Sequence, residues 1–209
     1  MNWPWPAPID DGAASHLIPG LAVPDISLPA TSGRSISLAQ IPGRAVVFCY
    51  PWTGKPGLPN PPDWDTIPGA HGSTPEIEGI RDLYLGFEEM PTAVFGLSMQ
   101  TQGDQREFAQ RLELPFDLLS DAGGAFQKAL DLPTFETGGS RYLKRLTLVL
   151  RDGMIEEVFY PVHPPHAHAR EVLASITAKV TYAEESRLRS ELPRLPAVNL
   201  GPGKRGACG

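Results

Sequence analysis

GSTPEIEGIRD, residues 72–82, is the stretch of this sequence that decides the fold. Ser73 favours the position at which a helix begins, Pro75 is tolerated in a first helical turn, and Glu76 follows Ser73 by three residues. This spacing is that of a capping box, so it predicts a helix with Ser73 as its N-cap. A helix N-terminus has unpaired N–H groups and about half a positive charge, and therefore favours an anion or a polarised oxygen.

The segments beside that stretch alternate between strands and helices. Residues 45–50 and 92–99 are continuous apolar runs, typical of strands buried on both faces. Between them, one helix face up to Met90 is marked by apolar residues at helical spacing: Ile77, Ile80, Tyr84 and Phe87. A strand, a helix and a second strand in this order favour an α/β protein.

The remaining pattern completes one domain. We expect an N-terminal hairpin in residues 20–43, a helix over 104–114, a strand within 116–121, a helix over 124–130, two strands around an Arg-Asp-Gly turn in 146–162, and a helix over 167–180. This order predicts a mixed central sheet with helices on both faces, which is a thioredoxin-like topology.

The chain divides into three parts. Residues 1–19 are proline-rich and predict an extended arm, anchored by Trp3 and Trp5 on the domain or on a second subunit. Residues 20–181 form the thioredoxin-like domain. Residues 182–209 become polar and then rich in Pro and Gly, so we expect a tail on the surface or against a neighbouring subunit.

Composition excludes several classes of partner. The net charge is −6 and no basic stripe is present, which argues against nucleic acid. Apolar runs fall short of the ~18 residues of a membrane span, and the N-terminus does not have the pattern of a signal peptide. The two cysteines do not form a disulfide framework. We therefore expect a cytoplasmic protein without a cofactor, acting on a small molecule.

A long loop follows the first central strand. Residues 52–70 contain five prolines together with Trp52 and Trp64, and loops of this length are usually functional or disordered. We expect a lid over a ligand pocket or part of a homodimer interface, with a passive surface excursion as the alternative. The other candidate ligand or lid residues flank the tryptophans: Pro51, Thr53 and Thr74.

Several motifs occur in the order known from one family. They are VPDISLPATSG (23–33), FCYP (48–51), GSTPEIEGIRD (72–82), VFGLSM (94–99), LPFDLLSD (114–121) and RLTLVLRDGMI (145–155). In residues 20–177 the sequence resembles the peroxiredoxins, in particular the branch that includes the bacterioferritin comigratory proteins. The resemblance implies a thioredoxin-like fold and a hydroperoxide-reducing ancestry.

The sequence departs from that family at its reactive residues. Aligned by its ends, residues 72–82 place Ser73 at the peroxidatic cysteine and Glu78 at the resolving one. The family's threonine falls at Ala70, and its upstream proline is displaced to Pro51. Arg145 matches the arginine that, in the family, holds the reactive sulfur and the peroxide.

Serine changes the chemistry, because thiol peroxidation requires a thiolate that becomes a sulfenic acid. We therefore predict a pocket of Ser73, His71 and Arg145 that binds a small anionic or oxygenated ligand or supports a thiol-independent reaction. A serine nucleophile would need a base and a carboxylate, for which His71 and Asp82 are the candidates. The alternatives are that Ser73 is only a helix cap and that Arg145 is only a surface residue of the hairpin.

Two other readings remain open. The protein could be an antioxidant enzyme in which Cys208 or Cys49 replaces the missing thiol, although the apolar run around Cys49 predicts an inert, buried side chain. It could instead be a partner-binding module, with the arm and the loop as contact surfaces. The candidate metal ligands His163, His166 and His168 are expected to form a solvated loop cluster and not a metal site.

Overall fold

The computed structural model describes residues 3–191, and their side chains as far as residue 182. The strands are β1 (Ser27–Pro29), β2 (Ser35–Ser37), β3 (Arg44–Cys49), β4 (Thr92–Ser98), β5 (Asp117–Ser120), β6 (Thr134–Thr137), β7 (Ser140–Leu143), β8 (Leu146–Arg151) and β9 (Met154–Phe159). The helices are α1 (Ser73–Asp82), α2 (Tyr84–Glu89), α3 (Gln102–Arg111), α4 (Ala125–Leu130) and α5 (Pro165–Glu191), with 3-10 turns at Leu38–Gln40 and Trp64–Thr66.

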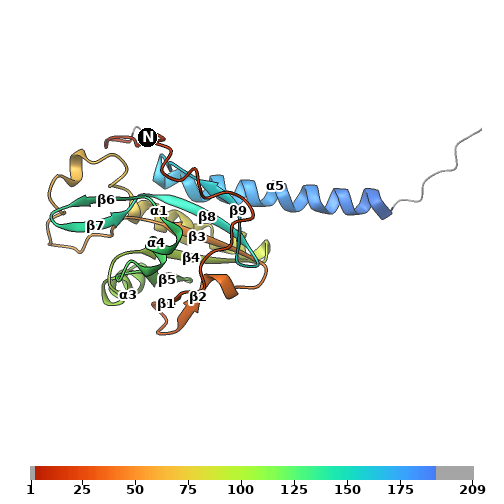
Figure 1. Cartoon of the computed structure of the whole chain (residues 1–209), viewed down its shortest axis with the longest axis horizontal. Helices are drawn as coiled ribbons and strands as arrows, with labels where there is room; N and C mark the ends of the chain where they lie inside the picture. Colours follow the sequence, from red (N-terminus) through yellow and green to blue (C-terminus); the bar gives the residue numbers. More distant parts are fainter. Residues whose placement is uncertain (1–2, 192–209) are drawn as a thin grey trace, which may run out of the picture.

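The central sheet has the strand order β5-β4-β3-β8-β9 (Figure 1). β3 pairs in parallel with β4 and antiparallel with β8, and β8 continues into the hairpin with β9. β3 therefore lies in the middle of a mixed sheet, as its apolar run predicted. The N-terminal hairpin β1–β2 is also confirmed.

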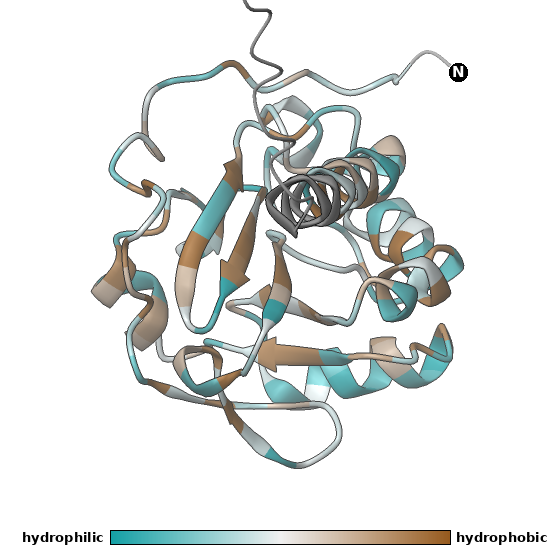
Figure 2. Cartoon of the chain, turned by 90° about the vertical axis from the view of Figure 1, so that its right-hand side faces the viewer, coloured by the Kyte–Doolittle hydropathy of each residue, from teal (hydrophilic) through white to brown (hydrophobic). Residues whose placement is uncertain are grey.

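Alternate residues of β3 face two separate cores. Val47 and Cys49 belong to the core that is covered by β1–β2 and α4, whereas Phe48 packs with residues of α1, α2, α3 and α5 on the other face. This division follows from the period of two along a strand. Hydrophobic residues accordingly follow the strands in Figure 2, while the outward sides of the helices carry hydrophilic ones.

The largest differences from the prediction are two helix boundaries and one hairpin. The single helix expected up to Met90 breaks at Leu83, whose ψ of 7° does not continue the helix, so α1 and α2 are separate. α5 continues to Glu191, beyond the predicted end at Val180, and the predicted tail thus begins as helix. The hairpin β6–β7 was not predicted, because its strands are only four residues each.

None of the helices between residues 3 and 191 is both long enough and apolar enough to cross a membrane. Cys208 lies outside the described residues, as does most of the predicted tail.

Candidate functional site

The N-terminus of α1 meets the beginning of β8 at a buried polar contact. Arg145 precedes β8 and is only 3% exposed. Its Nη2 donates to Ser73 Oγ at 3.1 Å and to the carbonyl oxygen of His71 at 3.2 Å, and its Nη1 donates to Glu76 Oε2. Arg145 is therefore not a surface residue of the hairpin. Its side chain connects the first turn of α1 to the start of β8.

The capping box predicted from Ser73 and Glu76 is wrong. The N-cap is Gly72, with a φ of 110° that favours glycine, and Ser73 is the first helical residue. The Glu76 carboxylate does not return to the helix terminus, because it is fully buried and forms an ion pair with Arg145. A buried guanidinium requires a counter-charge, and this requirement outweighs the local capping bond.

The ion pair is incompletely satisfied. Within the described residues, Glu76 Oε1 and Arg145 Nε have no hydrogen-bond partner. Burial raises the pKa of Glu76 to about 7, against the opposing effect of the Arg145 charge. The carboxylate is therefore close to its point of protonation near neutral pH, so the pair is positive below pH 7 and becomes neutral as Glu76 ionises.

His71 precedes Ser73 by two residues, but its ring makes its contacts elsewhere. Its Nε2 is 2.8 Å from Asp65 Oδ1, and the ring stacks on Trp5 at a centroid distance of 3.7 Å and an angle of 8°. Asp82, the candidate third member, pairs with Arg81 at the far end of α1. The hydrogen bonds of the described residues thus give Ser73 no base, and a serine-nucleophile triad is not assembled.

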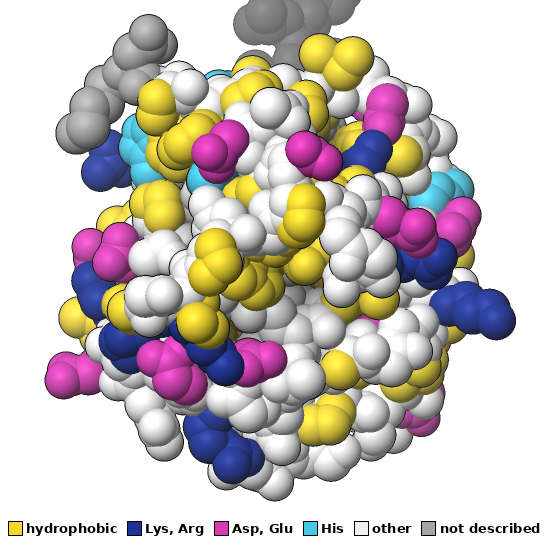
Figure 3. Space-filling model, turned by 90° about the vertical axis from the view of Figure 1, so that its left-hand side faces the viewer, with side chains coloured by type: hydrophobic (Ala, Val, Ile, Leu, Met, Phe, Trp, Pro, Cys, Tyr) yellow, Lys and Arg dark blue, Asp and Glu magenta, His cyan; other side chains and the backbone are white. Residues whose placement is uncertain are grey.

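All four tryptophans of the chain line one hollow of about 320 Å³ beside Ser73 and Thr74. We call this space the Trp hollow. Trp3 and Trp5 come from the arm, and Trp52 and Trp64 come from the loop. Figure 3 faces the side of the molecule on which β6–β7 and the loop lie, and it shows hydrophobic side chains in the middle of this face with charged side chains around them.

The loop of residues 52–70 folds onto the hairpin β6–β7. Trp64 is 3% exposed and packs against Phe135 at 5.6 Å and Tyr142 at 5.1 Å between ring centroids. Trp52 meets Trp64 edge to face at 5.5 Å. The loop is thereby held as one wall of the Trp hollow.

Two hydrogen-bonded anchors fix the beginning of that loop. The backbone N–H of Thr53 donates to Gln100 Oε1 at 2.8 Å, and Ser98 Oγ donates to the Pro51 carbonyl at 3.3 Å. Pro51 and Thr53 are both buried, so they position the loop and do not line the hollow. Thr74, by contrast, lines it.

Cys49, the cysteine within the described residues, lies in an environment that disfavours the thiolate. Cys49 is fully buried in β3, and burial raises the pKa of its thiol well above the ordinary range. The predicted burial of Cys49 is thus confirmed, and a thiol that stays protonated is a poor nucleophile. Glu78, aligned with the resolving cysteine, lies half-buried on α1.

The three histidines do not form the expected loop cluster. α5 begins at Pro165, so His166 and His168 are helical and only His163 stays in the loop. His166 stacks near Trp3 at 5.6 Å, and the buried His168 shares hydrogen bonds with Thr147 Oγ1 at 2.8 Å and Glu171 at 3.0 Å. Among the side chains that the structure describes, residues 3–182, no cluster of three metal-ligating groups occurs.

One partner in the site was missed by sequence reasoning although a signal existed. Glu76 precedes Ile80 by four residues and so shares its buried face of α1, where an acidic side chain needs a counter-charge. Nothing in the sequence indicated that Asp65 and Trp5 would contact His71.

Comparison with known proteins agrees with this architecture. The family model described as Redoxin matches residues 18–175. Peroxiredoxin Q, chloroplastic, of Oryza sativa subsp. japonica is 27% identical over 155 residues, which are 74% of this chain and 64% of the rice protein. Peroxiredoxin bcp1 of Schizosaccharomyces pombe is 32% identical over 123 residues, which are 58% of this chain and 55% of the yeast protein.

The fold is also found among solved structures. The crystal structure of peroxidoxin BcpB from Mycobacterium tuberculosis has a TM-score of 0.63 and 28% identity, and the match covers 78% of this chain and 98% of that one. The chain thus spans less than two thirds of the rice relative but nearly all of the bacterial structure. The match over residues 18–175 shows that this chain belongs to the Redoxin family.

Proposed function

We propose that the Ser73–Arg145 site binds a small anionic or oxygenated ligand in the Trp hollow and that it does not work as an ordinary thiol peroxidase. The observation that carries the proposal is the hydrogen bond from Arg145 Nη2 to Ser73 Oγ at the first residue of α1. Under the alignment above, an oxygen occupies the position of the reactive sulfur, with the arginine still in place.

The chemistry of serine supports the loss of peroxidase activity. A thiol peroxidase forms a bond from a thiolate to one peroxide oxygen and releases the other as water or alcohol, which leaves a sulfenic acid. A serine hydroxyl has no equivalent oxidised state, and here it lacks a base among its described partners. Arg145 and the N-terminus of α1 can thus still bind an anion although the redox step is lost.

The geometry of the hollow supports ligand binding. The N–H groups of Ser73 and Thr74 have no acceptor within α1, because the first groups of a helix are left unpaired. Ser73 Oγ accepts from Arg145, so its own proton is available to a ligand. The half-buried tryptophans supply apolar walls, and such a combination of apolar surface with a few polar groups is typical of ligand pockets.

Peroxide consumption with dithiothreitol as reductant tests the redox half of the proposal. We expect no turnover from the native protein and measurable turnover from Ser73→Cys, with Ser73→Ala as the matched control. Peroxide turnover by the native protein would contradict the proposal, and turnover that Ser73→Ala leaves unchanged would assign the reaction to a group other than Ser73.

Tryptophan fluorescence tests the binding half, because three of the four tryptophans around the hollow are partly exposed. Titration with acetate, nitrate and hydrogen peroxide should change the emission of the native protein. Arg145→Met should weaken these titrations, whereas Arg141→Met, an exposed neighbour paired with Glu136, should not. Identical titrations of the two variants would overturn the assignment of the site.

Family membership favours a second candidate, hydroperoxide reduction through another thiol. Cys49 is a poor candidate because of its burial, which leaves Cys208. Peroxide turnover that is abolished by Cys208→Ser and kept in Cys49→Ser would establish this alternative.

Exposed apolar side chains favour a third candidate, a partner-binding or homodimeric module. Ile9 in the arm is 81% exposed, and Leu58 in the loop is 62% exposed. Sedimentation of the native chain and of a chain lacking residues 1–19 would test this: a dimer lost with the arm supports it, and a monomer in both excludes a homodimer.

A further inference from the structure

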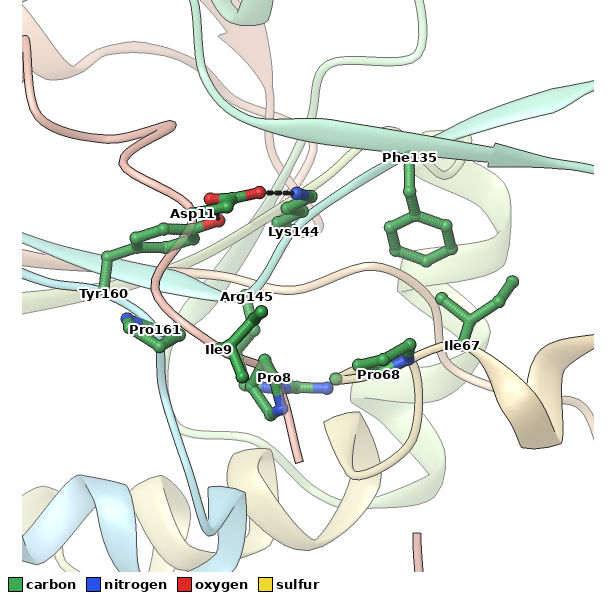
Figure 4. A pocket seen from close by; sticks show the side chains of 11 residues that line it. Pro8, Ile9, Asp11, Ile67, Pro68, Phe135, Lys144, Arg145, Tyr160 and Pro161 are labelled. Carbon is green, nitrogen blue, oxygen red and sulfur yellow. Dashed lines mark hydrogen bonds and ion pairs between the residues drawn. The ribbon is translucent and has the colours of Figure 1, made fainter. Parts of the chain in front are cut away.

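A second cavity lies between the arm and the domain, on the other side of the Arg145 contact. It has a volume of about 270 Å³ and mainly apolar walls. The arm contributes Pro8 and Ile9, the loop contributes Ile67 and Pro68, and β6 contributes Phe135. We call this space the arm cavity. Figure 4 shows these apolar side chains around the space, with Asp11 and Lys144 across from Pro8 and Pro68.

The polar end of the arm cavity already holds a carboxylate. Asp11 Oδ2 accepts from Lys144 Nζ, and Asp11 Oδ1 accepts from Tyr160 Oη at 2.6 Å and from the backbone N–H of Ala13 at 3.1 Å. The hydrogen bond from Lys144, followed by that from Tyr160, holds the pKa of Asp11 well below its usual range. Lys144 and Tyr160 therefore form a pair of hydrogen-bond donors suited to an ionised carboxylate.

We propose that the arm cavity is a binding site for a small apolar carboxylate, whose carboxylate group takes the place of Asp11 on Lys144 and Tyr160 while its hydrocarbon body fills the apolar space. Asp11, a residue of the arm, then competes with the ligand for Lys144 and Tyr160. The site does not depend on the chemistry of Ser73, and its lining shares no residue with that of the Trp hollow, because Arg145 lines only the arm cavity.

The size of the cavity limits the ligand. An apolar protein cavity of about 150 Å³ accepts a benzene molecule, so a space of about 270 Å³ suits a body of roughly eight to ten carbons. An alkylammonium ion is disfavoured because Lys144 and Arg145 both line the cavity. A neutral alcohol would fill the apolar space but would gain less from Lys144 than a carboxylate does.

Calorimetric titration of the full chain with octanoate, octanol and octylammonium tests the proposal. We expect octanoate to bind most tightly and octylammonium not to bind. Asp11→Asn should tighten octanoate binding about two- to fivefold, because the ion pair it weakens is partly exposed and such pairs are worth at most a factor of that size. Asp10→Asn is the matched control, since Asp10 does not line the cavity and its substitution should leave the affinity unchanged.

Two further variants complete the test. Lys144→Met should weaken octanoate binding by about fivefold or more, and Tyr160→Phe should weaken it by a smaller factor while keeping the ring in place. If Lys144→Met does not fold, Tyr160→Phe and Asp11→Asn still decide. The proposal is overturned if octanoate binds no more tightly than octanol, or if Asp11→Asn weakens octanoate binding or affects it no more than Asp10→Asn does.

Discussion

Replacing Arg145 by methionine should destabilise the protein by an amount that depends on pH. The guanidinium is buried, and its only carboxylate partner, within the part of the chain that the structure describes, is the fully buried Glu76. Breaking a buried ion pair by removing one partner costs about 3–5 kcal/mol, because the remaining charge is left uncompensated. The substitution also removes hydrogen bonds to Ser73 Oγ and the His71 carbonyl, at about 1–3 kcal/mol for the groups left without a donor.

The sign of the pH dependence follows from Glu76. Burial raises its pKa from 4.5 to about 7, so the folded state favours the protonated form. The stability that Glu76 contributes is therefore full below pH 4.5 and is lost as the pH rises through 7. Arg145 opposes this rise of the pKa. Its removal moves the pKa of Glu76 higher still, so the loss of stability with rising pH becomes larger in Arg145→Met.

Urea unfolding, followed by tryptophan fluorescence at pH 5 and pH 8, measures this effect. We expect Arg145→Met to cost about 3–5 kcal/mol or more at pH 8, and only about 1–3 kcal/mol at pH 5, where Glu76 is protonated. The pKa of His168 is lowered by burial and, as a smaller effect, by the charge of Arg145, so Arg145→Met also changes this histidine. Comparison of Arg145→Met with a double variant that also lacks Arg145 removes this contribution, because the two share it.

The double variant Glu76→Gln/Arg145→Met is the control, because it removes both charges and nearly preserves the volume. At pH 8 it should be more stable than Arg145→Met alone, as buried ion pairs are often replaced by neutral groups without loss. A cost for Arg145→Met that is the same at both pH values, or a double variant as unstable as the single one at pH 8, would refute the reasoning.

Three further outcomes can be measured on the same variants and their neighbours. Trp64→Ala should cost about 3–5 kcal/mol in urea unfolding, because it empties a buried aromatic site beside Phe135, whereas Trp64→Phe should cost less. Gly72→Ala should lower the melting temperature, since its φ is positive and an added Cβ would overlap Pro165; Gly123→Ala, where the space is open, is the matched control and should be near neutral. Acetate binding in the Trp hollow should weaken as the pH rises from 6 to 8, because ionised Glu76 neutralises the arginine, and Glu76→Gln should remove this dependence.

The sheet could be predicted from the sequence because its signals are local. The apolar run in β3 and the Arg-Asp-Gly turn between β8 and β9 each mark one element, and the order of such elements restricts the topology. The site was harder, since its decisive contacts join residues far apart in the chain. Arg145 follows Glu76 by 69 residues. The place of Glu76 on the buried face of α1 indicates that it needs a counter-charge, but nothing within residues 72–82 indicates which residue supplies it.

The contacts that order the loop of residues 52–70 could not be predicted either, because they also involve residues that are distant in the chain. Its tryptophans and prolines indicated a functional segment, but the surface that orders it is β6–β7, whose strands are too short to give a clear pattern. Trp64 becomes a core residue only because that hairpin supplies Phe135 and Tyr142. The sequence thus shows the loop that forms one wall of the Trp hollow, but it does not show the hairpin that supports this wall.

The arm connects the two cavities in a way that composition alone does not reveal. Trp5 closes one side of the Trp hollow, and Pro8 with Asp11 closes one side of the arm cavity. Residues 3–11 are attached by the ring stacks of Trp3 on His166 and Trp5 on His71, a backbone hydrogen bond from Gly69 to the Pro6 carbonyl at 3.2 Å, and the partly exposed contacts of Asp11 with Tyr160 and Lys144. Further along the arm, Ala14 and Leu17 are buried in the core. Each contact of residues 3–11 is individually weak, and a proline-rich segment lacks the internal hydrogen bonds that would stiffen it. We therefore expect residues 3–11 to detach at a lower free energy than the domain unfolds, so that both cavities can widen without domain unfolding.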